Sequence, residues 1–189
     1  MIKIGLLGDI GSGKSFIAKN FGYPVFNADY EVSQLYKKDK KTFNKLKKIL
    51  PKYFNSYPIK KHEVTEAILA NSNNLKKIVK VIHLEIRKKM NFFLKKNKNK
   101  KVVILDVPLL LENRINKKND ILIFVQSKKL DILKRLKKRA NFNQKLLIKF
   151  RKLQLPLDYK KRKSHFIIKN NFTNKLFKKD VKYILKKVL

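Results

Sequence analysis

The sequence has no cysteine and no apolar run long enough to span a membrane. Without cysteine the chain cannot form a disulfide, a thiolate metal site or a catalytic thiol. No segment approaches about 18 consecutive apolar residues. The first ten residues, MIKIGLLGDI, also lack the apolar stretch of an export signal. We therefore expect a soluble cytoplasmic protein that has no membrane partner.

Acidic residues are scarce: 13 Asp and Glu are set against 49 Lys and Arg, so the net charge is +36. Such a charge attracts the phosphates of nucleic acids and anionic membranes. The lysines, however, are spread along the chain rather than clustered with stacking aromatic residues. Asn, Ile and Phe are abundant too, and AT-rich codons favour all of these residues. We interpret the charge as the product of an AT-rich, reduced bacterial genome and expect no specific nucleic-acid partner.

Five short apolar segments predict the strands of a buried parallel sheet. Segments with helical periodicity separate them, and this alternation favours an α/β fold with helices on both faces of the sheet. Strands are predicted at 2–8, 24–29, 102–108, 121–126 and 165–169, and helices at 14–21, 30–36, 75–94, 130–139, 144–153 and 173–188. The mostly helical insertion after the second strand is too long for a simple crossover, so we expect a separate lobe.

Glycine is rare, and its distribution is uneven. All five glycines lie in the first 22 residues, and four of them fall within nine positions. The segment from Gly8 to Ser15, GDIGSGKS, fits the phosphate-binding pattern G-x-x-x-x-G-K-[ST], with a predicted strand before it and a predicted helix after it. Backbone N–H groups converge on a phosphate only where φ is positive and no Cβ intrudes, so glycine is needed there.

This motif predicts a nucleotide site. Lys14 would reach the β- and γ-phosphates, and the Ser15 hydroxyl would ligate Mg²⁺. The start of the following helix would add its unpaired N–H groups. Kinases, ATPases and GTPases all share such a loop, so the reaction must be inferred from residues further along the chain.

Two acidic residues follow predicted strands. Asp29 ends the second strand at the carboxyl edge of the sheet, where ligands of α/β sheets bind, and it could accept the proton of an attacking hydroxyl. Alternatively, Asp29 caps the predicted helix 30–36. Asp106 follows an apolar strand, a pattern typical of a residue that orders Mg²⁺.

Basic residues supply further candidates. His83 and Arg87 share one face of a predicted helix, where they bind a ligand or simply pack. Arg135, Arg139 and Arg151 lie on predicted helices on either side of residues 140–143. This layout suits a lid that brings cations to a transferring phosphoryl group, although each arginine alone would be an ordinary solvated residue.

Together these residues resemble the dephospho-CoA kinase family, which carries out the last step of coenzyme A synthesis. The matching segments follow one another nearly end to end: GLLGDIGSGKS, VFNAD for the family's D-A-D, IHLEIR for H-P-x-x-R, DVPLLLEN for P-L-L-x-E, KRLKKR and KLQLP in the lid, and KKRKSHFIIKNN for a lysine and A-D-x-V-I-x-N-N. Five positions depart from that pattern: Asn27 replaces the first Asp of D-A-D, Ser33 an Arg, Leu84 a Pro, His165 an Asp and Phe172 a Gly.

The resemblance implies a three-layer P-loop kinase fold with a five-stranded, mostly parallel sheet. A single domain, 1–189, would contain a core (1–29, 101–134 and 164–189), a helical substrate lobe (30–100) and a lid (135–163). The implied reaction transfers the γ-phosphoryl group of ATP to the ribose 3′-hydroxyl of dephospho-CoA, giving CoA and ADP, with Mg²⁺ as cofactor.

The resemblance also implies a role for each site residue. Asp29, Lys14 and Arg139 would be catalytic, and Ser15 and Asp106 would hold the metal. The ATP site would contain Gly8, Asp9, Ile10, Gly11, Ser12, Gly13, Lys14, Ser15, Phe16, Arg135 and Asn170. The acceptor site would contain Asp29, His83, Arg87, Pro108, Leu110, Glu112 and Lys160.

Two other functions stay open. Another P-loop kinase of the nucleoside-monophosphate or shikimate type would share the phosphate-binding loop. The absence of glycine after Gly22 counts against shikimate kinase, whose acceptor site resembles a glycine-rich turn. A basic P-loop protein that binds nucleic acid would instead show steeply salt-dependent binding and phosphorylate no acceptor.

Overall fold

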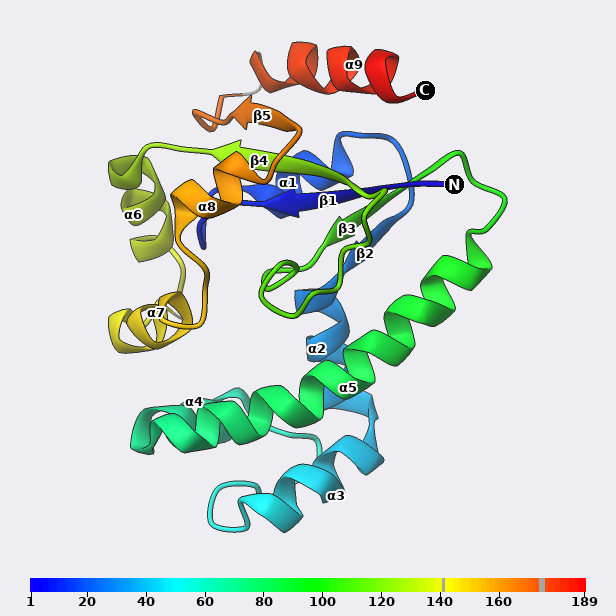
Figure 1. The fold of residues 1–189 in the computed structure, drawn as a ribbon. Helices are drawn as coiled ribbons and strands as arrows, with labels where there is room; N and C mark the ends of the chain where they lie inside the picture. The colour runs from blue at the N-terminus through cyan, green and yellow to red at the C-terminus, as the bar shows by residue number, and fades with distance from the viewer. Residues whose placement is uncertain (141, 174–175) are drawn as a thin grey trace. The chain divides into compact units, whose positions relative to one another are not determined.

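The structure, a computed structural model, describes residues 1–140, 142–173 and 176–189. Its five-stranded sheet has the order β2-β3-β1-β4-β5, and every strand pairing is parallel (Figure 1). The strands are β1 (Ile2–Leu7), β2 (Val25–Asn27), β3 (Val102–Asp106), β4 (Ile121–Gln126) and β5 (Phe166–Lys169). The sheet confirms the α/β prediction, and each strand falls inside a predicted segment.

The strands form because apolar runs bury both faces of the sheet. All five residues of β3 are buried, and so are the inner four of β4. On one face, apolar residues of the sheet form a core with two helices, α1 (Lys14–Lys19) and α9 (Leu176–Val188). These helices contribute Ile17 and Ala18, and Phe177, Val181 and Ile184, respectively. This core supports the loop that joins β1 to α1.

The remaining helices are α2 (Ala28–Lys38), α3 (Lys40–Ile49), α4 (Lys61–Ala70), α5 (Ser72–Lys96), α6 (Lys129–Lys137), α7 (Gln144–Arg151) and α8 (Leu157–Arg162). In α5 the buried residues Leu75, Ile78, Ile82, Ile86 and Met90 recur every three or four positions, which is the helical spacing that predicts this element. The short, basic α8 shows no such period and was not predicted. Nor were α3 and α4 predicted as separate helices; they lie in the insertion that was expected only to be mostly helical. The predicted helix 173–188 includes positions 174 and 175, which lie outside the described residues, as does position 141 in the predicted lid.

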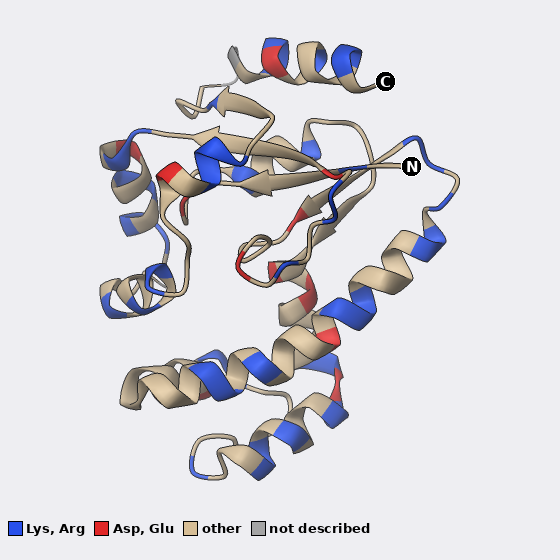
Figure 2. Cartoon of the chain, in the orientation of Figure 1, with Lys and Arg blue, Asp and Glu red and all other residues tan. Residues whose placement is uncertain are grey.

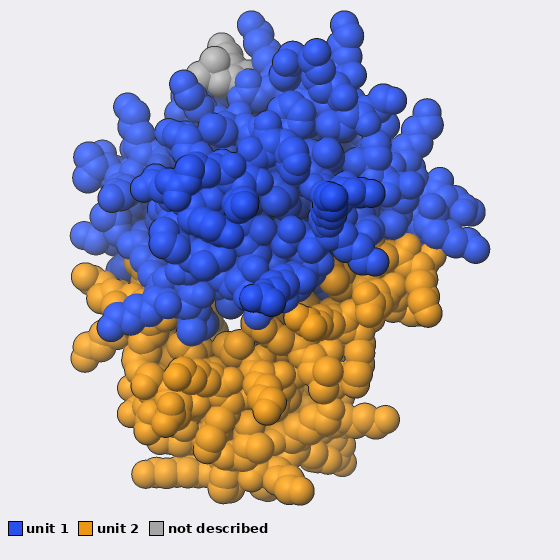
Figure 3. Space-filling view, in the orientation of Figure 1, with its two compact units in different colours: residues 1–27, 97–143, 150–189 blue, residues 28–96, 144–149 orange. Residues whose placement is uncertain are grey.

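The chain divides into two compact units (Figure 3). Unit 1 contains residues 1–27, 97–143 and 150–189 and therefore the whole sheet. Unit 2 contains residues 28–96 and 144–149, and within it α5 packs against α2, α3 and α4. Lys and Arg occur on helices of both units (Figure 2). Among the described residues, every helix is too short or too polar to cross a membrane.

The junction between β2 and α2 corrects one prediction. The predicted second strand reaches Asp29, but strand pairing ends where Asn27 lies opposite Asp106, and α2 begins at Ala28. Asp29 therefore lies in the first turn of α2, neither at the end of the strand nor as a cap of helix 30–36. Ala is the best helix former, and an acid in the first turn interacts favourably with the helix dipole, so the helix starts early.

Candidate active site

The loop between β1 and α1 has the backbone that the glycine pattern predicts. Gly8, Gly11 and Gly13 have φ values of 141°, 88° and 93°, which side chains rarely tolerate. A Cβ on Gly8 would lie 2.6 Å from the Val125 carbonyl oxygen, and a Cβ on Gly13 would collide with the Asn170 amide. The glycines therefore let neighbouring segments close around the loop and allow the backbone curvature with which N–H groups converge on an anion.

Two polar groups of this loop are prepared for a ligand. Lys14 is 8% exposed, and its ammonium group donates to the carbonyl oxygens of Gly8 and Asp9 at 3.1 and 2.8 Å. The Ser12 hydroxyl is buried and, among the described residues, has no hydrogen-bond partner. A buried hydroxyl without a partner is costly unless a ligand satisfies it, and a phosphate oxygen would do so.

A polar cluster at the carboxyl ends of β2 and β3 faces the start of α1. The Asn27 side-chain amide donates to the Asp106 carboxylate at 2.6 Å and to the Ser15 hydroxyl at 3.4 Å. Burial raises the pKa of Asp106, and the hydrogen bonds from Ser15 and Asn27 and the charge of Lys14 offset this rise only in part. The cluster therefore holds an incompletely compensated carboxylate beside a hydroxyl, an oxygen-rich pair that suits a hard cation such as Mg²⁺.

Asn27 was not among the predicted site residues. In the sequence it stands out only because it replaces the first Asp of the family's D-A-D, and its position in that motif is the signal that could have marked it. Its amide joins the two residues predicted to hold the metal.

Asp9 and Arg151 form a second contact that sequence reasoning missed. The Arg151 guanidinium donates to both carboxylate oxygens of Asp9, at 2.7 and 3.3 Å. An acid in an anion-binding loop would repel phosphate, and this two-point pairing neutralises it. Arg151 was predicted only as a general lid cation; the structure shows which group it meets.

The side chains of Asn170, Phe172 and Arg135 lie around Gly13. The Asn170 amide, which is 3% exposed, donates to the Ser12 carbonyl oxygen at 2.8 Å. The Arg135 guanidinium carbon lies 4.2 Å from the centre of the Phe172 ring. Arg139 is exposed and follows the end of α6 rather than lying within the predicted helix.

Glu112 and Lys160 meet each other. The Lys160 ammonium is 2.6 Å from a Glu112 carboxylate oxygen, and their side chains are 1% and 9% exposed respectively. The same oxygen accepts from the Leu155 N–H at 3.0 Å. The pair thus ties the segment after β3 to the segment that contains α8. Nearby, Pro108 is half-buried, and Leu110 is buried against Gly5.

The other predicted acceptor residues belong to unit 2. Asp29 is exposed in the first turn of α2, and α5 carries the half-buried His83 and the exposed Arg87. The structure thus brings together the predicted phosphate and metal residues in unit 1 and places these three in the other compact unit. Their predicted roles stay predictions.

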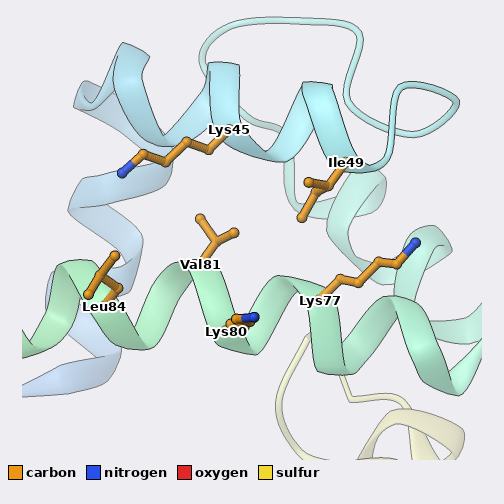
Figure 4. A pocket seen from close by; sticks show the side chains of 6 residues that line it. All are labelled: Lys45, Ile49, Lys77, Lys80, Val81 and Leu84. Carbon is orange, nitrogen blue, oxygen red and sulfur yellow. The ribbon is translucent and has the colours of Figure 1, made fainter.

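Unit 2 also has a pocket of about 510 Å³ between α3 and α5 (Figure 4). Lys45 and Ile49 project from α3, and the other lining residues, Lys77, Lys80, Val81 and Leu84, project from α5. The lining therefore combines apolar side chains with ammonium groups. No residue predicted for the ATP, acceptor or metal site lines it.

Two departures from the family pattern have visible consequences. The His165 ring nitrogen accepts from the Leu122 N–H at 3.0 Å, and the His165 N–H donates to the Leu122 carbonyl at 2.8 Å, so this residue extends the pairing of β5 with β4. Phe172 has a φ of 63°. This conformation favours glycine, the residue that Phe172 replaces.

Comparison with known proteins agrees with these observations. A family model described as "Dephospho-CoA kinase" matches residues 2–175. A dephospho-CoA kinase of Wolbachia sp. subsp. Brugia malayi (strain TRS) is 36% identical over 170 residues, or 87% of each chain. Another, from Fusobacterium nucleatum subsp. nucleatum, is 35% identical over 188 residues, or 93% of each chain.

Solved structures show the same fold. The crystal structure of TT1252 from Thermus thermophilus has a TM-score of 0.80 and 21% identity, and the alignment covers 100% of this chain and 98% of that one. The dephospho-CoA kinase from Campylobacter jejuni has a TM-score of 0.64 and 20% identity, with 98% and 96% covered. These likenesses confirm the predicted P-loop kinase fold.

Proposed function

The chain belongs to the dephospho-CoA kinase family, and on this premise we propose that it transfers the γ-phosphoryl group of ATP to the ribose 3′-hydroxyl of dephospho-CoA. The observation that carries the proposal is the glycine loop of residues 8–13, followed by the buried Lys14, on a chain whose family match covers residues 2–175. Within the described residues, the Ser12 hydroxyl of this loop has no hydrogen-bond partner. The products are CoA and ADP.

The loop binds the donor through groups that already point into it. Backbone N–H groups of residues 8–15 donate to the polyphosphate oxygens, and the Ser12 hydroxyl gains the partner it lacks among the described residues. Lys14 exchanges its contacts with the Gly8 and Asp9 carbonyl oxygens for the β- and γ-phosphates. Arg139, exposed after α6, places a further positive charge at the transferring group.

Asp29 orients the acceptor hydroxyl and accepts its proton as the oxygen attacks phosphorus. Its carboxylate is exposed in the first turn of α2. His83 and Arg87 bind the acceptor, since Arg suits its phosphate groups. Glu112 and Lys160, which pair with each other, hold the surrounding segments in place.

Ser15 and Asp106 fit a magnesium ion. Their hydroxyl and carboxylate oxygens are ligands that Mg²⁺ takes in phosphoryl-transfer sites, and Asp106 is buried with too little positive charge around it. When bound, the ion neutralises charge on the phosphate oxygens. Asn27 keeps the two residues in register before any ion arrives.

The test is an ADP-release assay with purified full-length protein, Mg·ATP and one acceptor at a time. Dephospho-CoA should be phosphorylated, and shikimate, AMP and CMP should give at most background rates. Mass spectrometry of the product should place the new phosphate on the ribose. Turnover of one of the other acceptors with none of dephospho-CoA would replace the proposal with another small-molecule kinase.

A further inference from the structure

Phe172 lies beside the phosphate-binding loop in a conformation that phenylalanine rarely adopts. Its φ of 63° is in the left-handed region, where a bulky side chain is uncommon and strained. Such strain persists only where the surrounding structure holds it, and it occurs preferentially at functional sites. The position is therefore a reason to ask what the ring does.

Hydrogen bonds tie the turn at residues 170–172 to the phosphate-binding loop. The Phe172 N–H donates to the Asn170 side-chain oxygen at 3.0 Å, and the Asn170 amide donates to the Ser12 carbonyl at 2.8 Å. The Asn170 N–H also donates to the Gln126 carbonyl at 2.8 Å, which ties the turn to the end of β4. The backbone at Phe172 is thus tied, through Asn170, both to the phosphate-binding loop and to the end of β4.

The ring and the Arg135 guanidinium lie together beside Gly13. A Cβ built on Gly13 would be 3.3 Å from the Phe172 ring and 3.6 Å from an Arg135 nitrogen. The guanidinium carbon is 4.2 Å from the ring centre, a close cation–π contact. A guanidinium is planar and has two faces, so a ring beside one face leaves the other available, and the Arg135 side chain is exposed.

We propose that Phe172 holds Arg135 flat beside Gly13, so that the open face of the guanidinium stacks on the base of the bound nucleotide. The phosphates occupy the loop, and only the ribose separates them from the base, so a planar surface at the last glycine of the loop is within reach of the base. An exposed arginine without the ring would have to be ordered on binding, at an entropic cost. Phe172 is therefore a positioning residue that acts through Arg135.

The inference rests on the proposed function only in taking a nucleotide as the ligand, and its test needs no acceptor. Binding of Mg·ATP and of magnesium tripolyphosphate, which has no base, is measured by calorimetry for the wild type, Phe172→Ala and Phe172→Gly. Both variants should bind ATP about tenfold more weakly, because base stacking is lost. Tripolyphosphate affinity should change less than about twofold, because the phosphate loop is intact.

The Ala and Gly variants are matched controls for strain. Both remove the ring, but only Ala keeps a Cβ at positive φ, so Phe172→Gly should melt about 2–4 °C higher than Phe172→Ala. Equal losses of ATP affinity in two variants of different stability would separate the ring's role in binding from its role in folding. Phe172→Tyr should bind ATP as the wild type does.

A double-mutant cycle tests the route through Arg135. Phe172→Ala should have less than about a twofold further effect in the Arg135→Ala background, since the two residues act as one unit. The inference is overturned if both ring-free variants bind ATP as tightly as the wild type, or if they lose tripolyphosphate to the same extent. A chain that binds ATP in this way but leaves dephospho-CoA unphosphorylated would instead contradict only the proposed function.

Discussion

Asp106 in unit 1 and the pair Asp39 and Glu85 in unit 2 have pKa values shifted in opposite directions. In unit 2, hydrogen bonding to Lys45 lowers the pKa of Glu85. Burial raises the pKa of Asp39, but the hydrogen bonds that it accepts from Thr42 and Lys41 at the start of α3 outweigh this effect, and the net shift is downward. In unit 1, burial raises the pKa of Asp106, and its hydrogen bonds do not compensate.

This difference separates structural from functional acids. A lowered pKa means that the folded state favours the charged form, so the Glu85 and Asp39 contacts stabilise unit 2. A raised pKa means that folding disfavours the charged form, so ionised Asp106 reduces the stability of unit 1. A group held at such a cost beside a phosphate-binding loop is a candidate for binding a cation.

The largest expected effect is that of Asp29→Asn. Replacing the proposed base should lower kcat by about 10²–10⁴-fold, because no group of suitable basicity then takes the proton of the attacking hydroxyl. ADP release at saturating substrates measures it. The matched control in unit 2 is Asp39→Ala, which removes the cap of α3 and should cost about 1 kcal/mol of stability while kcat is unchanged. Near-normal turnover by Asp29→Asn would remove Asp29 from the role.

Lys160→Met should destabilise the protein strongly. The substitution leaves the carboxylate of Glu112 buried without its ion-pair partner, and breaking such a pair costs about 3–5 kcal/mol in the free energy of unfolding. Urea denaturation measures the change. Adding Glu112→Gln should restore most of the stability, because no buried charge then remains. A single variant as stable as the wild type would show that the pair does not hold these segments together.

Asp106→Asn should separate function from stability within unit 1. We expect half-maximal activity to need about 10–100-fold more Mg²⁺, while the free energy of unfolding does not fall. Activity is titrated with Mg²⁺ at fixed ATP. The control is Asp120→Asn, because Asp120 accepts from the Lys117 N–H at 2.8 Å and pairs with Lys3 at 3.6 Å. Asp120→Asn should lose stability and keep its Mg²⁺ dependence. If Asp106→Asn lost stability and Asp120→Asn changed the Mg²⁺ dependence instead, the assignment of Asp106 to the metal site would be wrong.

The smallest expected effect is in the pH dependence of stability. Folded Asp106 keeps its proton to a higher pH than the unfolded chain does. Between the pKa of Asp106 in the unfolded chain and its higher pKa in the folded protein, stability therefore falls as pH rises. The stability that Asp106→Asn gains over the wild type should therefore shrink on acidification. Folded Glu85 loses its proton more readily, so its contribution is complete above its ordinary pKa and is lost as pH falls through the lowered one.

Denaturation of Asp106→Asn and Glu85→Gln from neutral pH downward checks both signs. The Glu85 difference should stay below about 1 kcal/mol, because its partner Lys45 is largely solvated. Two curves with the same sign would contradict the division between structural and functional acids.

The strands, α5 and the phosphate-binding loop were predictable because each depends on neighbouring residues. Apolar runs predicted β1 and β4, the spacing of Leu75 to Met90 predicted α5, and the glycines predicted the loop. The predicted end of β2 was wrong, because strand pairing and helix propensity compete over residues 27–29. The short helix α8 was missed because its six residues, LDYKKR, have no apolar period.

The sequence by itself determined the loop, because positive φ at Gly8, Gly11 and Gly13 is a property of single residues. Only the tertiary structure decided which side chains complete the site. Asn27 meets Asp106 across 79 positions, and Arg151 meets Asp9 across 142. Side chains so far apart in the chain leave no local pattern; the register of β2 on β3 and the close approach of distant segments bring them together.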